Sequence, residues 1–265
     1  MEELTSLNGR QVKRILELKQ KKYRERYGLF LMEGIRSAED ALLQGFQNAS
    51  LYVTRETAAE VRADAVIKRA RVQGWRITFV TEAVMNKLSG TEHGQGMLAV
   101  LPIPKRELSE CKPDADAKFV LLDAVQDPGN MGTILRTAAA AGISGVILTE
   151  GCTDPYAEKA VRSSMGSILR MPVYTHVTPE ELDAFMKETG LPLLALTLEG
   201  GRPYREVSEI RGGIFAFGNE GAGISSDIVK RADEKLYVPM AGGVESLNVS
   251  VCAGIVLFHF KHGEK

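Results

Sequence analysis

Apolar residues in the second half of the chain gather in short continuous runs, and longer mixed segments separate the runs. The runs predict buried strands at residues 118–124, 145–149, 192–198, 213–217 and 235–240. The segments between them predict helices at 130–141, 155–164, 179–188 and 225–231, and a last helix from about 246 to 262. Apolar strands that alternate with helices are typical of a parallel sheet covered on both faces. We therefore predict an α/β domain with a parallel sheet.

The first hundred residues predict a smaller unit of the same class. Strands are expected at 29–32, 50–54, 75–80 and 96–101, and helices at 36–45 and 58–73. A stretch with three prolines and mixed charge, LPIPKRELSECKPDAD at 101–116, has no period and indicates a connection between domains. We place a small α/β domain at 1–105, a linker at 106–116 and the parallel-sheet domain at 117–265.

Composition narrows the class of protein. A hydrophobic content of 44% and a charged content of 25% over 265 residues are typical of a soluble globular protein. No stretch is long and uncharged enough to span a bilayer, and the first residues lack the apolar core of a signal peptide. The three cysteines are far apart, and no His, Cys or carboxylate cluster has metal-ligand spacing. We expect a cytoplasmic protein with no membrane partner and no metal.

Charge is unevenly distributed. Residues 1–105 hold 17 Lys and Arg against 12 Asp and Glu, and the remainder holds 16 against 22. The basic excess is sharpest between 10 and 26, where Tyr23 and Tyr27 lie among the charges. This pattern fits a nucleic-acid contact surface. The candidate RNA-binding residues are Lys13, Arg14, Lys21, Lys22, Arg24 and Arg26. An ordinary amphipathic surface helix would show the same pattern.

Three loops with Gly, Asn and one charged residue follow predicted strands and precede predicted helices. They are DPGNMG at 127–132 with Arg136 beyond it, FGNEG at 217–221, and the segment from Val238 to Asn248. Because parallel strands bring their carboxyl ends to one edge, we expect one site there. Small residues before a helix leave main-chain groups free for a small polar ligand.

Each candidate residue also has a structural explanation. Asn130, Ser246 and Asn248 are good helix caps. Arg136 lies on a helix of small and apolar residues, where it is either an ion-pair partner or an anion clamp. Glu220 fits a solvated turn, although the glycines beside it allow another molecule to approach the main chain.

The same motifs resemble a known family. NxGxxxR at 130–136, GNEG at 218–221 and PMxGxxxSLNVSVxAGI at 239–255 resemble the three motifs of the SpoU-type RNA 2'-O-ribose methyltransferases, within the trefoil-knotted SPOUT group. Residues 30–42 and 93–100 make the first domain similar to the group's substrate-binding domain, which is like a small ribosomal RNA-binding protein.

The resemblance implies methyl transfer from S-adenosylmethionine to a ribose 2'-hydroxyl of RNA, a homodimer, and a C-terminal knot. Ribosomal RNA is favoured over transfer RNA because a separate RNA-binding domain precedes the catalytic one. The expected catalytic residues are Arg136, Asn130, Glu220, Ser246 and Asn248. The expected cofactor-binding residues are Thr197, Gly218, Asn219, Glu220, Gly221, Val238, Pro239, Met240, Leu247 and Asn248.

Arg136 is expected to bind RNA as well. A guanidinium stays protonated, so it suits an adjacent phosphate and the charge developing on the ribose oxygen better than it suits a general base. The proton has three possible acceptors, namely Glu220, a water molecule or the phosphate.

Two other functions are compatible with an α/β protein. A non-catalytic RNA-binding protein of the same fold would show damage at Arg136, Glu220 or Asn248, and all three are present. A nicotinamide-dependent oxidoreductase would need a GxGxxG turn after its first strand. The corresponding turn here reads VQDPGNMG, so this function is disfavoured.

Overall fold

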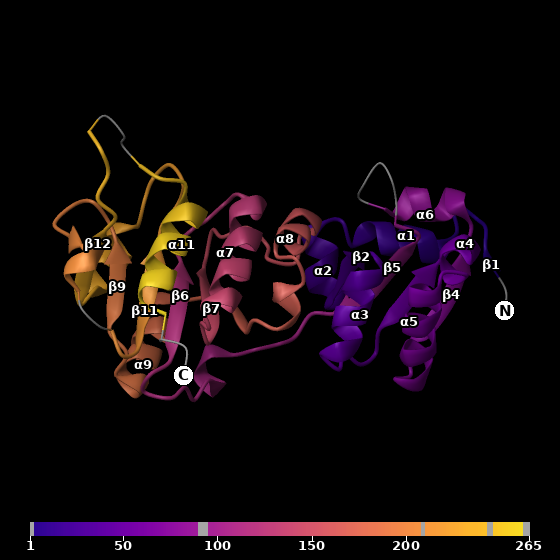
Figure 1. The fold of residues 1–265 in the computed structure, drawn as a ribbon, viewed down its shortest axis with the longest axis horizontal. Helices are drawn as coiled ribbons and strands as arrows, with labels where there is room; N and C mark the ends of the chain where they lie inside the picture. The colour runs from indigo at the N-terminus through magenta and orange to yellow at the C-terminus, as the bar shows by residue number, and fades with distance from the viewer. Residues whose placement is uncertain (1–2, 90–94, 208–209, 243–245, 262–265) are drawn as a thin grey trace. The chain divides into compact units, whose positions relative to one another are not determined.

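The chain forms two compact units, each with a sheet of its own (Figure 1). The computed structural model describes residues 3–89, 95–207, 210–242 and 246–261. One unit comprises Met1–Pro104 and Tyr156–Arg162, and the other comprises Lys105–Pro155 and Ser163–Lys265.

The first unit has a five-stranded sheet in the order β1-β4-β3-β5-β2. Strand β5 is antiparallel to both its neighbours, whereas β1, β4 and β3 run parallel to one another. The strands are β1 (Glu3–Leu4), β2 (Leu29–Glu33), β3 (Ser50–Val53), β4 (Arg76–Val80) and β5 (Met97–Pro102). The helices are α1 (Arg10–Glu17), α2 (Lys21–Tyr27), α3 (Ile35–Leu43), α4 (Arg55–Ala58), α5 (Val61–Val72) and α6 (Glu82–Leu88).

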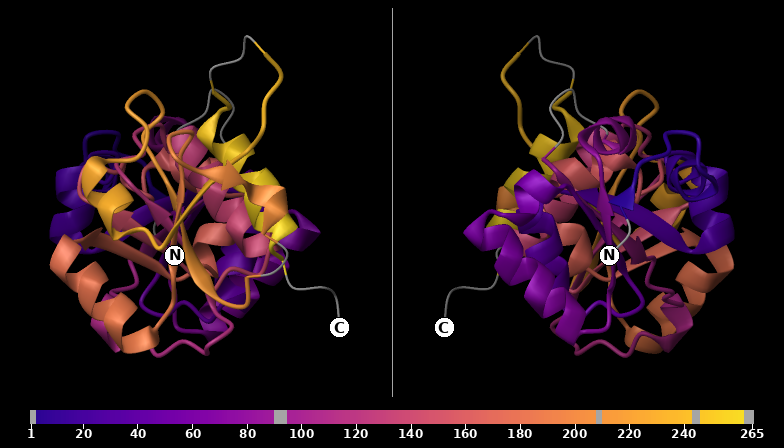
Figure 2. Two further views of the ribbon diagram at one scale, coloured as in Figure 1. Left: turned by 90° about the vertical axis from the view of Figure 1, so that its left-hand side faces the viewer. Right: turned by 90° about the vertical axis from the view of Figure 1, so that its right-hand side faces the viewer.

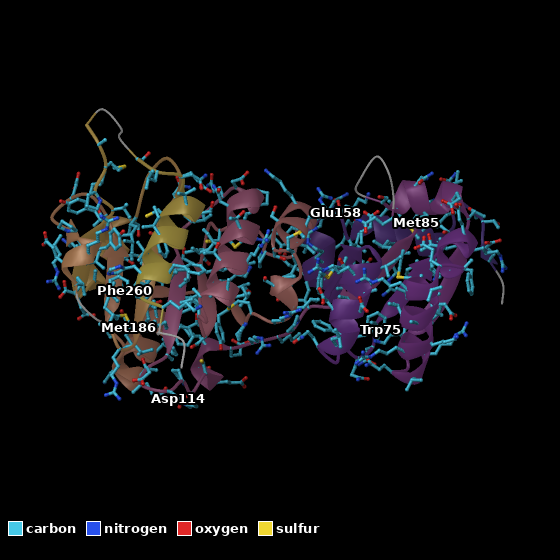
Figure 3. The ribbon with its side chains drawn as sticks, in the orientation of Figure 1. Trp75, Met85, Asp114, Glu158, Met186 and Phe260 are labelled. Atoms are coloured by element: carbon cyan, nitrogen blue, oxygen red, sulfur yellow. The ribbon has the colours of Figure 1, made fainter. Side chains whose placement is uncertain are left out.

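Helix α1 has one buried side and one basic side. Its Val12 and Ile15 belong to a buried cluster with Val84 and Leu88 of α6, and its basic residues remain on the outside. Directly before β4, the indole N–H of the buried Trp75, which is labelled in Figure 3, donates to the Phe46 carbonyl at 2.8 Å. The amphipathic character of the basic segment was predicted from the sequence. The separate helix α6 was not.

The second unit has seven strands in the order β10-β12-β9-β11-β6-β7-β8, and all of these pairings are parallel. The strands are β6 (Lys118–Leu122), β7 (Gly145–Thr149), β8 (Val173–Val177), β9 (Leu193–Leu196), β10 (Arg202–Pro203), β11 (Gly213–Phe217) and β12 (Glu234–Tyr237). The helices of this unit are α7 (Pro128–Ala140), α9 (Pro179–Thr189), α10 (Ser226–Arg231) and α11 (Val249–His259), with short 3₁₀ turns at 108–110, 167–169 and 204–206. Helix α8 (Glu158–Ser163) follows β7 in the chain, but its residues up to Arg162 are grouped with the first unit. The predicted parallel sheet is confirmed.

Alternation along the central strands assigns helices to the two faces of this sheet. Phe119 and Leu121 of β6 pack with Leu182 and Phe185 of α9 in one buried cluster. Helices α7 and α11 lie side by side away from that cluster (Figures 1 and 2). Phe260, which follows α11, stacks on Phe215 of β11 with ring centroids 5.4 Å apart, so α11 is held against the other face.

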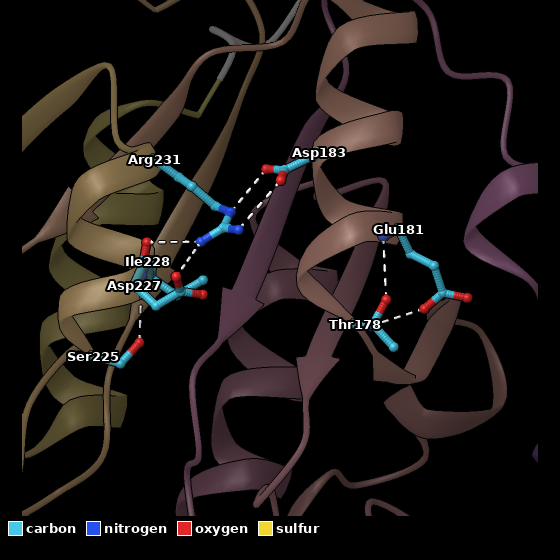
Figure 4. A network of polar contacts seen from close by, with 7 residues as sticks. All are labelled: Thr178, Glu181, Asp183, Ser225, Asp227, Ile228 and Arg231. Atoms are coloured by element: carbon cyan, nitrogen blue, oxygen red, sulfur yellow. Dashed lines mark hydrogen bonds and ion pairs between the residues drawn. The ribbon is translucent and has the colours of Figure 1, made fainter.

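Polar contacts hold α10 beside α9 (Figure 4). The Arg231 guanidinium donates to both carboxylate oxygens of Asp183, at 2.8 and 3.2 Å, and it pairs with Asp227 one turn earlier in α10. Helix α9 begins with a reciprocal cap between Thr178 and Glu181. Residues 218–225, which lead into α10, therefore end at a helix that is held in place by α9.

Several elements differ from the sequence prediction; for example, β12 ends at Tyr237 rather than at 240, and the helix predicted at 58–73 covers the last residue of α4 and the whole of the separate α5. The last helix begins at Val249 rather than near Ser246, because the Asn248 side chain accepts the Ser250 and Val251 N–H groups and caps it. Its predicted end at His262 lies outside the described residues. Strand β6 stops two residues early, since Ala124 has a φ of 55°. Edge strand β8, whose Thr175 and His176 are exposed, was missed.

Within the described part of the chain, no helix combines the length and the apolar character that crossing a membrane requires.

Candidate active site

The loops singled out in the sequence meet at the carboxyl edge of the second sheet. Strands β12, β9, β11 and β6 are consecutive neighbours, so the residues that follow them lie on one edge. Thr197 follows β9, and its N–H donates to Leu236 of β12 at 2.9 Å. Gly218 follows β11, and Val238 follows β12.

Glu220 is the centre of the polar contacts at this edge. One carboxylate oxygen accepts the Asp127 N–H at 3.0 Å and the Asn130 side-chain amide at 3.0 Å. The other accepts the Gln126 N–H at 3.1 Å. Three donors from the β6–α7 segment therefore bind a residue about 90 positions later in the chain.

These contacts set the protonation of Glu220. Partial burial by itself raises the pKa of the carboxyl, but the hydrogen bonds from Asn130, Gln126 and Asp127 outweigh it and leave the pKa below its ordinary value. The side chain is therefore a carboxylate at neutral pH, and it has a low affinity for a proton.

A directional chain of amides joins the third motif to this carboxylate. The Asn248 side-chain amide donates to the Asn130 side-chain oxygen Oδ1 at 3.0 Å, and the Asn130 side-chain N–H in turn donates to Glu220. The Asn248 oxygen is held by the Ser250 and Val251 N–H groups at the start of α11. Each of the two amides keeps a second N–H for which the described residues provide no acceptor, so both can bind a ligand. Asn248 thus does more than begin a helix. The expectation that Asn130 caps its helix is wrong, because the N-cap of α7 is Asp127, whose side chain accepts the Asn130 N–H at 2.8 Å.

The loop around Glu220 is tightly built. The Asn219 amide donates to the Ala124 carbonyl at 2.8 Å, and its oxygen accepts the Gly221 and Ala222 N–H groups, both at 2.9 Å. The main chains of Asn219 and Gly223 also pair with each other. This folds the loop into a compact turn with Glu220 at its tip.

Arg136 lies on the exposed side of α7, near Thr133 one turn earlier. Among the described residues the structure records no hydrogen bond or ion pair for its guanidinium. Of the two sequence explanations, the ion-pair partner has no support within this part of the chain. An exposed guanidinium on a small-residue helix is free to bind an anion.

The remaining predicted residues of the third motif and its surroundings differ in their exposure to solvent. Val238, Met240 and Leu247 are half-buried, and Pro239 and Ser246 are exposed. Residues 243–245, in the middle of the third motif, lie outside the described residues, as do His93 and Gly94 of the likeness in the first unit. The main chain is closely packed near Thr197, because a Cβ on Gly201 would lie 2.8 Å from the Thr197 carbonyl oxygen.

The basic residues of the first unit form an ordered surface on α1 and α2, with one exception. Tyr23 and Tyr27 stack with centroids 5.9 Å apart. The Lys22 ammonium lies 4.7 Å from the Tyr23 ring centroid, and the Arg14 guanidinium lies 4.9 Å from that of Tyr27. The exposed members are Lys13, Arg14, Lys21, Lys22 and Arg26.

Arg24 is a correction to the sequence analysis. It is only 4% exposed, and its guanidinium donates to the Leu18 carbonyl at 2.8 Å. It fastens the junction between α1 and α2 and is not available to RNA. A mixed basic segment cannot reveal which of its cations faces inward.

Three residues at the edge were missed by sequence reasoning. Gln126 and Asp127 donate to Glu220 through their main-chain N–H groups, which carry no sequence signal. Asp123, directly after β6, is 7% exposed and accepts the Ser225 N–H at 2.7 Å; a carboxylate ending an apolar strand could have suggested it. Among the described residues, no group of three His, Cys, Asp or Glu is arranged to hold a metal ion.

Comparisons with known proteins agree with this geometry. The SpoU rRNA methylase family model matches residues 117–258, and the MRM3-like substrate binding domain model matches residues 9–99. The 23S rRNA (guanosine(2553)-2'-O)-methyltransferase RlmP of Bacillus subtilis strain 168 is 33% identical over 261 residues, which cover 98% of this chain and 100% of that protein.

Solved structures give the same result. An AdoMet-bound rRNA methyltransferase from Sinorhizobium meliloti matches with a TM-score of 0.89 at 32% identity, over 97% of this chain and 96% of that one. The SpoU methyltransferase AviRb from Streptomyces viridochromogenes, 24% identical over 95% of this chain and 96% of that one, shares the fold with a TM-score of 0.88. The chain belongs to the SpoU rRNA methylase family, so the resemblance found in the motifs is confirmed.

The compact Glu220 loop leads to a first prediction. A Cβ on Gly218 would lie 2.2 Å from the Gly223 carbonyl carbon and 2.2 Å from the Ile224 nitrogen. Gly218→Ala should therefore lower the free energy of unfolding by about 1–3 kcal/mol or more, as overpacking does. Urea denaturation measures this loss.

Gly221→Ala is the matched control in the same loop. The nearest atom to its added Cβ is the Asn219 side-chain oxygen, at 3.7 Å, so its unfolding free energy should stay close to that of the wild type. Equal effects of the two substitutions would contradict the loop geometry.

Proposed function

We propose that this protein transfers a methyl group from S-adenosylmethionine to a ribose 2'-hydroxyl of ribosomal RNA. The observation that carries the proposal is the chain of contacts from Asn248 through Asn130 to Glu220, which joins three distant motifs at the start of the helix that also carries the exposed Arg136. The names of the relatives support the same chemistry, since RlmP is a 23S rRNA 2'-O-methyltransferase.

We assign the cofactor to the edge formed by β12, β9 and β11. Thr197, the turn at 218–221 and the segment at 238–240 follow these three neighbouring strands, and Leu247-Asn248 enters from the third motif. A cofactor can approach the main chain at Gly221, because the nearest atom to a Cβ built there is the Asn219 side-chain oxygen, at 3.7 Å. The AdoMet-bound relative from Sinorhizobium meliloti supports the choice of cofactor. When bound, S-adenosylmethionine supplies a methyl group already activated on a sulfonium.

The residues of the chain then have to position the two reactants and stabilise the negative charge that develops on the ribose oxygen. Arg136 binds a phosphate next to the target ribose and stabilises negative charge on the attacking oxygen. Asn130 and Asn248, whose amides are already oriented, each direct one N–H toward the reactants. Ser246, exposed just before the α11 cap, completes this set. Holding two reactants in line is a large part of catalysis when no covalent intermediate is needed.

Glu220 is assigned to holding the loops and not to accepting the proton. Its lowered pKa makes it a weak base, and three donors already occupy its oxygens. Of the three acceptors left open by the sequence, a water molecule or the RNA phosphate takes this role.

The first unit supplies RNA affinity. Exposed cations on α1 and α2 neutralise phosphates without reading sequence. Ribosomal RNA is preferred over transfer RNA because two relatives that match over nearly their full length, RlmP and the Sinorhizobium meliloti enzyme, are rRNA methyltransferases by name. We assign the catalytic role to residues 117–265 and the RNA-binding role to residues 1–105, in a cytoplasmic enzyme. The knot implied by the family resemblance stays a prediction.

A homodimer is proposed from the surface of α11. Val251 and Phe258 on this helix are both 51% exposed, and apart from Ser250 and His259 the helix is made of apolar and small residues. A helix that is apolar on all sides is normally buried. A second copy of the chain is the occupant that the family resemblance implies for this surface.

Substitution of Arg136 tests the catalytic assignment. Arg136→Ala should lower kcat by about 100- to 1000-fold, as removal of a transition-state donor does. Arg136→Lys should fall in between, because it keeps the charge and loses the planar fork. Labelled-methyl transfer to unmodified ribosomal RNA measures both. Arg211→Ala, at an 82% exposed side chain paired with Asp116, is the control. Wild-type kcat in both Arg136 variants would exclude the role.

A charge-removal series tests the RNA surface. The combined change Lys21→Ala, Lys22→Ala and Arg26→Ala should weaken RNA binding and reduce the slope of log K against log salt by about 2, since each phosphate contact contributes about 0.7–0.9. Filter binding at several salt concentrations measures the slope.

The matched control removes three cations from α5, through Lys68→Ala, Arg69→Ala and Arg71→Ala. Each set contains one ion pair across a helical turn, Lys21 with Glu25 and Lys68 with Asp64. If both sets reduce the slope equally, the surface on α1 and α2 has no special role.

Sedimentation equilibrium tests the dimer. The wild type should sediment as a dimer, and Phe258→Glu should shift it toward monomer because a charge cannot be buried unpaired at low cost. Leu43→Glu, at a residue of similar exposure in the first unit, should leave the dimer intact. A monomeric wild type would contradict the proposal.

A further inference from the structure

Asp123 holds both ends of the loop that carries Glu220. It is 7% exposed and follows β6 directly. Its N–H donates to the Phe217 carbonyl at 2.9 Å, where the loop begins. Its side-chain oxygen Oδ2 accepts the Ser225 N–H at 2.7 Å, where the loop ends. One residue thus fixes the start and the finish of an eight-residue excursion at 218–225.

The residues after Asp123 continue this pattern. The Ala124 carbonyl accepts from Asn219, and the Gln126 and Asp127 N–H groups donate to Glu220. The segment 123–127 therefore forms hydrogen bonds with the Glu220 loop at Asn219, at Glu220 and at Ser225. Among these contacts, only that of Asp123 uses a side-chain atom of the segment, and it is made at Ser225, the last residue of the loop.

Two further contacts make this grip rigid. The Thr149 hydroxyl, at the end of β7, lies 3.3 Å from the other Asp123 carboxylate oxygen. Ser225 caps α10, which the Arg231–Asp183 contacts fix to α9 (Figure 4). Asp123 therefore ties the loop to an anchored helix and to a neighbouring strand.

We propose that Asp123 is a positioning residue for methyl transfer, acting through Glu220 on the orientation of Asn130 and Asn248. This rests on the proposed function. Without the Asp123 carboxylate, the far end of the loop loses its fixed point, and the Glu220 oxygens move relative to the donors that orient Asn130. The role assigned to Asp123 is indirect, through the position of the loop.

Kinetics of Asp123 variants test the proposal. At saturating RNA and S-adenosylmethionine, Asp123→Ala should lower kcat by about 30-fold, because displacements of roughly 1 Å cost up to about 100-fold. KM for RNA should remain within about 2-fold, since RNA affinity is assigned to the first unit. Asp123→Asn keeps one acceptor oxygen for Ser225 and should restore most of kcat.

Asp233→Ala separates positioning from stability. The Asp233 carboxylate also accepts a main-chain N–H, from Leu193 at 2.8 Å, at the start of β9 and away from the loop. All variants are assayed at a temperature where circular dichroism shows them folded. Asp233→Ala should keep wild-type kcat. A folded Asp123→Ala variant with wild-type kcat overturns the proposal.

A double-mutant cycle tests the route through Glu220. In a Glu220→Ala background, Asp123→Ala should cost less than about 3-fold more, since residues that act as a unit are non-additive. Full additivity of the two losses overturns the proposal.

Hydrogen exchange gives a readout that does not depend on activity. Peptides covering 218–225 should exchange faster in Asp123→Ala and unchanged in Asp233→Ala, and equal exchange in Asp123→Ala and wild type overturns the positioning. If the exchange result is as expected while the wild type methylates no RNA, the proposed function fails and the positioning of the loop stands.

Discussion

The carboxylate of Glu220 is the contact on which the candidate site depends. The N–H groups of Gln126 and Asp127 lie in a turn that offers them no strand or helix partner, and the charged oxygens satisfy both. Hydrogen bonds to a charged group are stronger than neutral ones. The same oxygens orient the Asn130 side chain. The carboxylate therefore pairs the two main-chain N–H groups and aligns the Asn130 amide at the same time. A neutral residue at 220 would leave two donors poorly paired and the amide of Asn130 free to turn.

This contact is possible only because of the order of the strands. Residues 127, 220 and 248 are far apart in the chain, but β6 and β11 are neighbours, and α11 returns beside α7. A parallel sheet collects the carboxyl ends of its strands at one edge, where ligands bind in α/β proteins. The tight turn after Gly218 and the left-handed Ala124 end two buried strands abruptly at this edge. The polar groups therefore begin immediately where the core stops.

Sequence patterns could predict the sheet and the three loops, because continuous apolar runs and glycine-asparagine loops are local signals. They could not predict which cation of the basic segment is buried. Arg24 faces inward because the turn at Leu18 presents a carbonyl to it, and that turn is set by packing. The role of Asp127 and Gln126 was equally hidden, since a main-chain N–H is the same for every residue except proline. The late start of α11 follows from Asn248 serving two partners at once, which depends on the position of Asn130.

Charge distribution explains why two units are needed. The residues after 105 carry 16 basic against 22 acidic side chains, so this part of the chain as a whole repels a polyanion. At physiological salt, charges interact over only about 8–10 Å, which lets one exposed cation act locally even on an acidic unit. Arg136 meets this condition, because it lies on a helix whose other exposed residues are small and uncharged. Bulk attraction for RNA then has to come from elsewhere, and the six exposed cations of α1 and α2, Arg10 included, can supply it. Affinity and catalysis are thereby separated, so the charge at the reaction centre can be set by the chemistry alone.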